Sequence, residues 1–230
     1  MSQIFTSTRL GGVAFAIACW PLATVGHAQE AKEKRTLQVT VHLLVDEEGA
    51  AAEPDEIDRW LTRASEHFAD AGVGFEPKIV REKVDSANVD SVAYRNSLVV
   101  RAAWDGTIHL FVARRVADKD KEGEWIAGVH WRYWGLVKAK QKQHCIILSA
   151  SACGIDTLTH EMGHFFGEAH TYDPDNMMDG SGRHAGAKFS ESQIDRIASV
   201  AGKMIGSAEL KPVTLDSAGS IDLTRDPPRS

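Results

Sequence analysis

The sequence predicts an α+β fold in which helices pack against a mixed β-sheet, and three observations support this. Residues 36–45 alternate along the chain and are rich in β-branched side chains, which indicates a strand. Residues 55–71 carry apolar side chains at helical spacing. Residues 190–193 form a capping box that opens another amphipathic helix. Strands and helices therefore follow one another in an order that fits a mixed sheet.

The first helix is predicted to start just after Pro54, an acceptable residue ahead of a helix. Its apolar side chains recur at helical spacing, at Ile57, Trp60, Leu61, Ala64 and Phe68. Four further strands are predicted, at residues 73–80, 107–112, 127–133 and 144–148. Residues 82–104 fit an insert or a short helix. The charged residues 118–124 indicate a surface loop, because the intervening lysines disfavour a calcium site.

Two helices are predicted in the second half of the chain. The first has Asp156 or Thr157 as its N-cap and offers four side chains to the core, Leu158, Met162, Phe165 and Phe166. The second carries an apolar stripe at Ile194, Ile197, Ala201, Met204 and Ile205. Between them, the Asp-Pro and Asp-Gly pairs of residues 171–180 predict that the chain reverses.

The most informative motif is H-E-x-x-H-x-x-G-x-x-H, at residues 160–170. On a helix, His160 and His164 leave the same face one turn apart, so both nitrogens can reach one zinc ion at about 2.0–2.1 Å. Gly167 can adopt the left-handed conformation that ends a helix, which lets His170 approach the same ion. Glu161 lies beside the first ligand. Three protein ligands leave one position for water, as in catalytic zinc sites. A solvated helix with incidental histidines is the alternative interpretation, and the five fixed positions disfavour it.

This segment resembles the signature of the metzincins, a clan of zinc metalloproteases. The resemblance extends to a methionine turn: Met178 lies eight residues after His170, a spacing similar to that of the matrixin branch, and Met177 is the alternative. An apolar, adaptable methionine can lie beneath a histidine cluster without competing as a ligand. Some branches carry a tyrosine ligand where this chain has Gly180, and Thr171 also differs from the usual residue. The subfamily is therefore not assigned.

The resemblance implies a metzincin-like (zincin) catalytic domain, with a mainly parallel mixed sheet, an active-site helix and a C-terminal helix. It implies one catalytic Zn²⁺ held by His160, His164 and His170. It also implies an endopeptidase that hydrolyses peptide bonds through a zinc-activated water, with Glu161 as general base.

In the resembled clan, the segment before the zinc helix contains an edge strand that pairs with an extended peptide or protein substrate. This segment is rich in aromatic residues, which could line substrate subsites or pack in the core: Trp125, Trp131, Tyr133 and Trp134. His130 lies in the same segment and is either a donor to the substrate or an ordinary strand histidine. The same alternatives hold for His184.

Residues 1–28 read as an export signal, with Arg9 ahead of an apolar run and small residues before the cleavage position. The run is too short for a transmembrane helix, so we expect an exported protein, secreted or periplasmic, without a stable membrane anchor. Residues 29–206 then form one protease domain. Residues 207–230 contain three prolines and no periodicity, which predicts a loose tail.

The cysteines fit an exported protein. Cys19 lies inside the signal, and Ala16 three residues before it disfavours lipidation. Cys145 and Cys153 remain as an even pair, for which we predict a disulfide, with two free thiols as the alternative. No cysteine precedes the first strand after residue 28, so we expect no inhibitory pro-segment; a separate protein inhibitor or export itself would have to restrain any activity.

The net charge is −6, and no basic cluster indicates nucleic acid or an acidic membrane as a partner. We expect a monomer. Two other functions remain open: a zinc amidase that acts on cell-wall or other non-protein amides, and a non-catalytic peptide-binding module. The retained Glu161 disfavours the second, because binding alone does not require a carboxylate between the ligands.

Overall fold

The computed structural model describes residues 34–182 and 186–213. The chain divides into two units, residues 1–30 and 31–230. The predicted export signal, Cys19, His184 and the tail beyond residue 213 lie outside the described residues.

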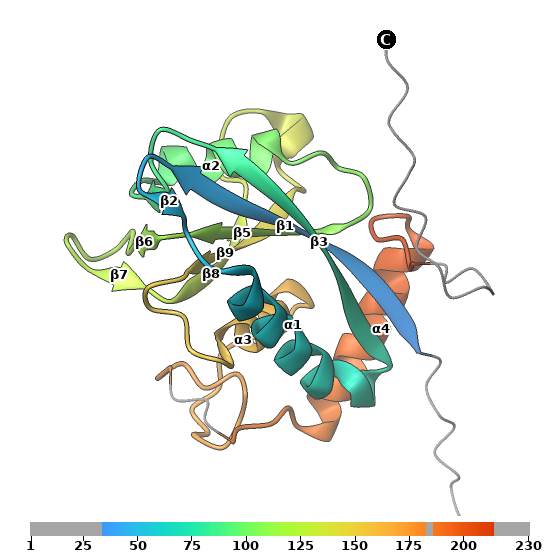
Figure 1. Ribbon diagram of the computed structural model, residues 1–230. Helices are drawn as coiled ribbons and strands as arrows, with labels where there is room; N and C mark the ends of the chain where they lie inside the picture. Colours follow the sequence, from blue (N-terminus) through green and yellow to red (C-terminus); the bar gives the residue numbers. More distant parts are fainter. Residues whose placement is uncertain (1–33, 183–185, 214–230) are drawn as a thin grey trace, which may run out of the picture. The chain divides into compact units, whose positions relative to one another are not determined.

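A six-stranded mixed sheet forms the centre of the second unit (Figure 1). Its strands are β1 (Arg35–Asp46), β2 (Gly49–Ala50), β3 (Val73–Lys83), β5 (Ile108–Ala113), β8 (Gly128–Arg132) and β9 (His144–Ser149). The order is β2-β1-β5-β9-β8, and β3 also pairs with β1. The long β1–β3, β1–β5 and β5–β9 pairs are parallel, whereas β2 and β8 run antiparallel to their neighbours. The predicted mixed, mainly parallel sheet is confirmed.

Helices cover both faces of this sheet (Figure 1). On one face, Val39, Val41 and Leu43 of β1 pack in a core cluster with residues of three helices, α1 (Pro54–Phe68), α3 (Thr157–Phe165) and α4 (Glu191–Gly206). On the other face, Leu44 packs in a second cluster with residues of α2 (Val92–Arg101). The alternation of side chains along β1 therefore divides the core into two layers.

The ambiguous residues 82–104 contain the end of β3, a short strand β4 (Asn88–Val89) and α2. Strand β4 joins β6 (Arg115–Ala117) and β7 (Trp125–Ile126) in a small three-stranded sheet. Two short 3₁₀ helices complete the described elements, η1 (Ala69–Ala71) and η2 (Lys138–Lys140). Helix α2 begins at the N-cap Ser91, whose Oγ accepts the backbone N–H of Tyr94.

The predicted disulfide is wrong, because both Cys145 and Cys153 are free. Side chains of β9 alternate between the two core clusters, and Cys145 belongs to the cluster on the α2 face. Cys153 packs against the cluster on the opposite face. The sheet therefore separates the two thiols, whereas a disulfide requires their Cβ atoms to approach within about 4.5 Å.

The prediction of a loose tail from residue 207 is wrong for residues 207–213, which pack on the domain. Leu210 is buried, with only 2% of its surface exposed. The N–H of Lys211 donates to the carbonyl of Gly106 at 2.8 Å, and the N–H of Val213 donates to that of Thr36 at 2.7 Å. Isolated backbone hydrogen bonds of this kind leave no periodic pattern in the sequence. The prolines and the missing periodicity therefore suggested a loose tail. Among the described residues, no helix is both long and apolar enough to cross a membrane.

Candidate metal centre

Helix α3 positions the first half of the H-E-x-x-H-x-x-G-x-x-H motif. It begins at Thr157 after the N-cap Asp156, whose side chain does not cap the helix. Instead, the Asp156 carboxylate accepts a hydrogen bond from Nε of Arg63 at 2.7 Å, which ties the start of α3 to α1. The helix ends at Phe165, and Gly167 adopts a left-handed φ of 89° that turns the chain towards His170. This is the left-handed backbone conformation on which the role predicted for Gly167 depends.

The three histidines of the motif converge on one point. Their Nε2 atoms lie 3.1 Å (His160–His164), 3.1 Å (His160–His170) and 3.0 Å (His164–His170) apart. His160 is buried, His164 is half-buried and His170 is exposed, so the cluster opens towards solvent on one side. Among the described residues, the side chains of these three histidines form the group that could hold a metal ion.

Backbone carbonyls fix which nitrogen of two of these rings carries the proton. Nδ1 of His160 lies 2.8 Å from the carbonyl oxygen of Met177, and Nδ1 of His164 lies 2.7 Å from that of Glu168. A carbonyl can only accept, so each Nδ1 donates and each Nε2 keeps its lone pair. Burial lowers the pKa of His164, which favours its neutral form. Unprotonated nitrogens at this spacing fit a shared zinc ion, which binds neutral imidazole.

The predicted methionine turn lies directly against α3. The N–H of Thr171 donates to the carbonyl of Met178 at 2.8 Å, which closes the reversal. A Cβ atom at Gly163, on the helix turn between His160 and His164, would clash with the sulfur of Met178. Both methionines are fully buried. Met178 thus packs its side chain beneath the helix, while Met177 contributes its carbonyl to His160.

The capping box of α4 also holds this turn in place. Gln193, its third helical residue, accepts a hydrogen bond from the side-chain Nδ2 of Asn176 at 2.9 Å and donates back to Oδ1 of Asn176 at 3.2 Å. The same Oδ1 accepts the backbone N–H of Met178 at 2.9 Å. The sequence predicted the helix start but missed this second role, because the Asn176–Gln193 pair spans two elements.

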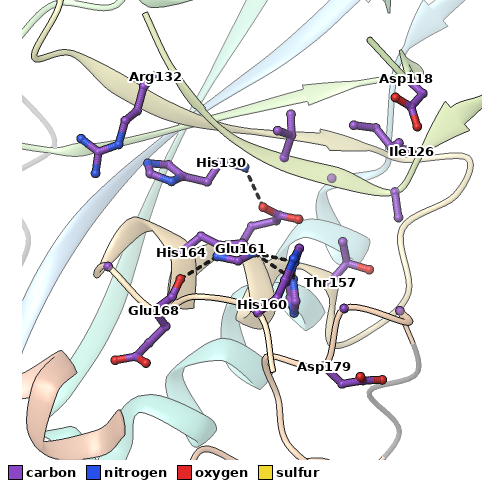
Figure 2. A pocket seen from close by; sticks show the side chains of 17 residues that line it. Asp118, Ile126, His130, Arg132, Thr157, His160, Glu161, His164, Glu168 and Asp179 are labelled. Atoms are coloured by element: carbon purple, nitrogen blue, oxygen red, sulfur yellow. Dashed lines mark hydrogen bonds between the residues drawn. The ribbon is translucent and has the colours of Figure 1, made fainter. Parts of the chain in front are cut away.

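Glu161 lies beside the cluster and is held by the edge strand β8 (Figure 2). Its Oε2 accepts the backbone N–H of His130 at 2.6 Å, and only 7% of the residue is exposed. Burial raises the pKa of the Glu161 carboxyl to about 7, and the hydrogen bond from His130 acts in the opposite direction. Gly128 permits this approach, because a Cβ there would lie about 3 Å from both Glu161 and Thr157 side chains.

A cavity of about 820 Å³ joins these groups. Besides the three histidines and Glu161, it is lined by residues of β8, including Gly128, His130 and Arg132, and by the loop after Met178 (Figure 2). Of the aromatic residues that the sequence suggested for subsites, none is among the described residues that line it. Trp131 packs in the core cluster on the α2 face instead.

The charged loop and Gly180 are two further features that the sequence singled out. Asp118, at the start of the charged loop, lines the cavity. In the charged loop, Lys119 pairs with Asp120 and Lys121 with Glu124. Gly180 takes the position at which some metzincin branches carry a tyrosine. It lies next to the ring of His170, and a Cβ at Gly180 would be in ordinary contact with that ring, at 3.5–3.6 Å.

Neither the family models nor the curated proteins compared with this sequence give a match. Solved structures do match. Metalloproteinase-II from Bacteroides fragilis superposes with a TM-score of 0.52 at 14% identity, over 75% of this chain and 55% of its own. A mirolysin complex gives 0.51 at 14% identity, over 73% and 91%. A promirolysin variant from Tannerella forsythia gives 0.53 at 13% identity, over 77% and 83%.

These likenesses show the fold. The chain has the metzincin-type α+β fold that the resemblance implied. It spans about half the length of the Bacteroides fragilis protein.

Proposed function

We propose that this protein is a zinc-dependent endopeptidase that acts after export. The observation that carries the proposal is the convergence of three Nε2 atoms, 3.0–3.1 Å apart, beside a buried carboxylate in an open cavity. When bound to His160, His164 and His170, a zinc ion would polarise the scissile carbonyl and lower the pKa of a water molecule. Residues 1–28, with the pattern of an export signal, support the location.

Glu161 is suited to move the proton in this reaction. A carboxyl whose pKa lies near 7 can both take up and release a proton at neutral pH. Because Oε2 accepts the N–H of His130, Oε1 is the oxygen left for the proton. Glu161 takes a proton from water as the water oxygen bonds to the carbonyl carbon. It then delivers this proton to the nitrogen as the carbon–nitrogen bond breaks.

Strand β8 is suited to bind the substrate. It is the last strand in the order of the main sheet, where it pairs with β9. Its residues also line the cavity (Figure 2). An extended peptide can therefore add to this edge through main-chain hydrogen bonds, next to Glu161 and the histidines.

A digest of a peptide library tests the proposal. We expect the zinc-loaded protein to cleave internal peptide bonds, a chelator to stop cleavage, and added zinc to restore it. Cleavage only at chain ends would exclude an endopeptidase. Activity confined to cell-wall amides would favour the amidase, and cleavage that persists in the chelator would overturn zinc dependence.

A further inference from the structure

Three polar side chains from distant parts of the chain form a hydrogen-bonded row that ends at the cavity. Nε2 of His130, on β8, lies 2.7 Å from Nδ1 of His144, on β9. Nε2 of His144 lies 3.3 Å from Oε1 of Glu209. Glu209 belongs to residues 207–213, and its backbone N–H is anchored to the carbonyl of Met204 at the end of α4.

The carboxylate at one end sets the direction of every hydrogen bond in this row. A carboxylate accepts only, so Nε2 of His144 donates to Glu209. Nδ1 of His144 then carries a lone pair and accepts from Nε2 of His130. Consequently Nδ1 of His130 is left with a lone pair. Burial lowers the pKa of both rings, that of His130 to about 2, so each ring carries a single proton.

Packing holds the middle ring in the orientation that this row needs. The ring of His144 stacks on that of Phe165, with centroids 4.4 Å apart and planes at 22°. Phe165 is on α3, next to the ligand His164, and it also contacts the ring of His130. Rotation of His144 would lose this stacking as well as both hydrogen bonds.

His130 connects the row to the chemistry in two ways. Its backbone N–H holds Oε2 of Glu161 at 2.6 Å, so the position of residue 130 sets the position of the carboxylate. Its ring also lines the cavity, above His164 in Figure 2. Nε2 of His130 is bonded to His144, so the remaining ring nitrogen of His130 is Nδ1, a hydrogen-bond acceptor.

We propose that Glu209, His144 and His130 form a positioning relay, which holds His130 against Glu161 and presents the Nδ1 lone pair of His130 to an N–H group of a peptide substrate. The peptide substrate in this inference rests on the proposed peptidase function. The tautomers of His130 and His144 do not depend on it. Glu209 and His144 are positioning residues in this scheme.

Long-range ¹H–¹⁵N correlation spectra of the zinc-loaded protein with ¹⁵N-labelled histidine test the relay without any activity assay. We expect His130 and His144 both as the Nε2–H tautomer. In Glu209→Gln the side-chain amide can donate as well as accept, so we expect mixed tautomers at both rings. The Nδ1–H tautomer in the parent protein, or spectra unchanged in Glu209→Gln, would overturn the relay.

Kinetics of the same variant test the link to Glu161 and the substrate. We expect Glu209→Gln to lower kcat/KM about tenfold, the loss that follows from one weakened hydrogen bond. The matched control is Glu47→Gln in the exposed turn between β1 and β2, for which we expect parental kinetics. Parental kinetics in Glu209→Gln would show that the relay positions nothing. A parent protein that cleaves no peptide would refute the proposed function and leave the tautomer test standing.

Discussion

Replacing Glu161 with glutamine is expected to lower kcat/KM for peptide hydrolysis by about 10²–10⁴-fold while zinc stays bound. Glutamine has nearly the same shape, and its carbonyl oxygen can still accept the N–H of His130. It cannot take a proton from water, however, so the proton transfer is lost. Peptide hydrolysis and metal content per chain, measured on the same preparation, check both halves of this expectation. Parental cleavage rates in this variant would contradict the role of Glu161.

The stability of the metal-free Glu161→Gln variant gives an independent check of the buried carboxylate. The pKa of Glu161 is raised from its ordinary 4.5 to about 7, so the ionised form is the destabilised one. Its penalty is absent below pH 4.5, grows as the pH rises towards 7 and is then constant, on the order of 3 kcal/mol. We therefore expect the substitution to raise the Tm of the metal-free protein more at pH 8 than at pH 4. An equal effect at both pH values would indicate an unperturbed carboxyl.

Replacing His170 with alanine is expected to lower zinc affinity by more than about 100-fold and to abolish hydrolysis at stoichiometric zinc. The two remaining histidines would leave the ion with half of a tetrahedral ligand set. His170 lies beyond the turn at Gly167, so its removal leaves the α3 hydrogen bonds intact. Competition with a chromophoric chelator measures the affinity.

The control for His170→Ala is Tyr172→Ala, in the same loop. The side chain of Tyr172 is fully exposed, so we expect parental zinc affinity and activity. If His170→Ala also kept the parental affinity, the third ligand would be another residue, and the triangle of Nε2 atoms would not be the metal site.

Local spacing explains what the sequence could predict. His160 and His164 are set by the helix repeat, and Gly167 by the conformation that brings His170 back. The longer strands of the mixed sheet were also predicted from single segments, whereas the two-residue strand β2 was not. Each of these inferences needs no knowledge of what lies across the fold.

Contacts between distant segments explain what the sequence could not predict. Cys145 and Cys153 are eight residues apart, yet the sheet lies between them. The carbonyl of Met177 and the side chain of Gln193 support the metal centre from outside the motif. Glu209 reaches His144 from a segment that its prolines suggested was loose. None of these pairings leaves a periodic or spaced pattern in the residues themselves.

Titration of the metal-free protein with zinc, followed by peptide hydrolysis, tests the three-histidine zinc centre most directly. Activity should be absent without metal, rise linearly to one zinc ion per chain and then stay constant. In His170→Ala, the same titration should show no rise at one equivalent. Hydrolysis by the metal-free protein, or a parent protein that binds one zinc ion and cleaves no peptide, would contradict a zinc peptidase built on His160, His164 and His170.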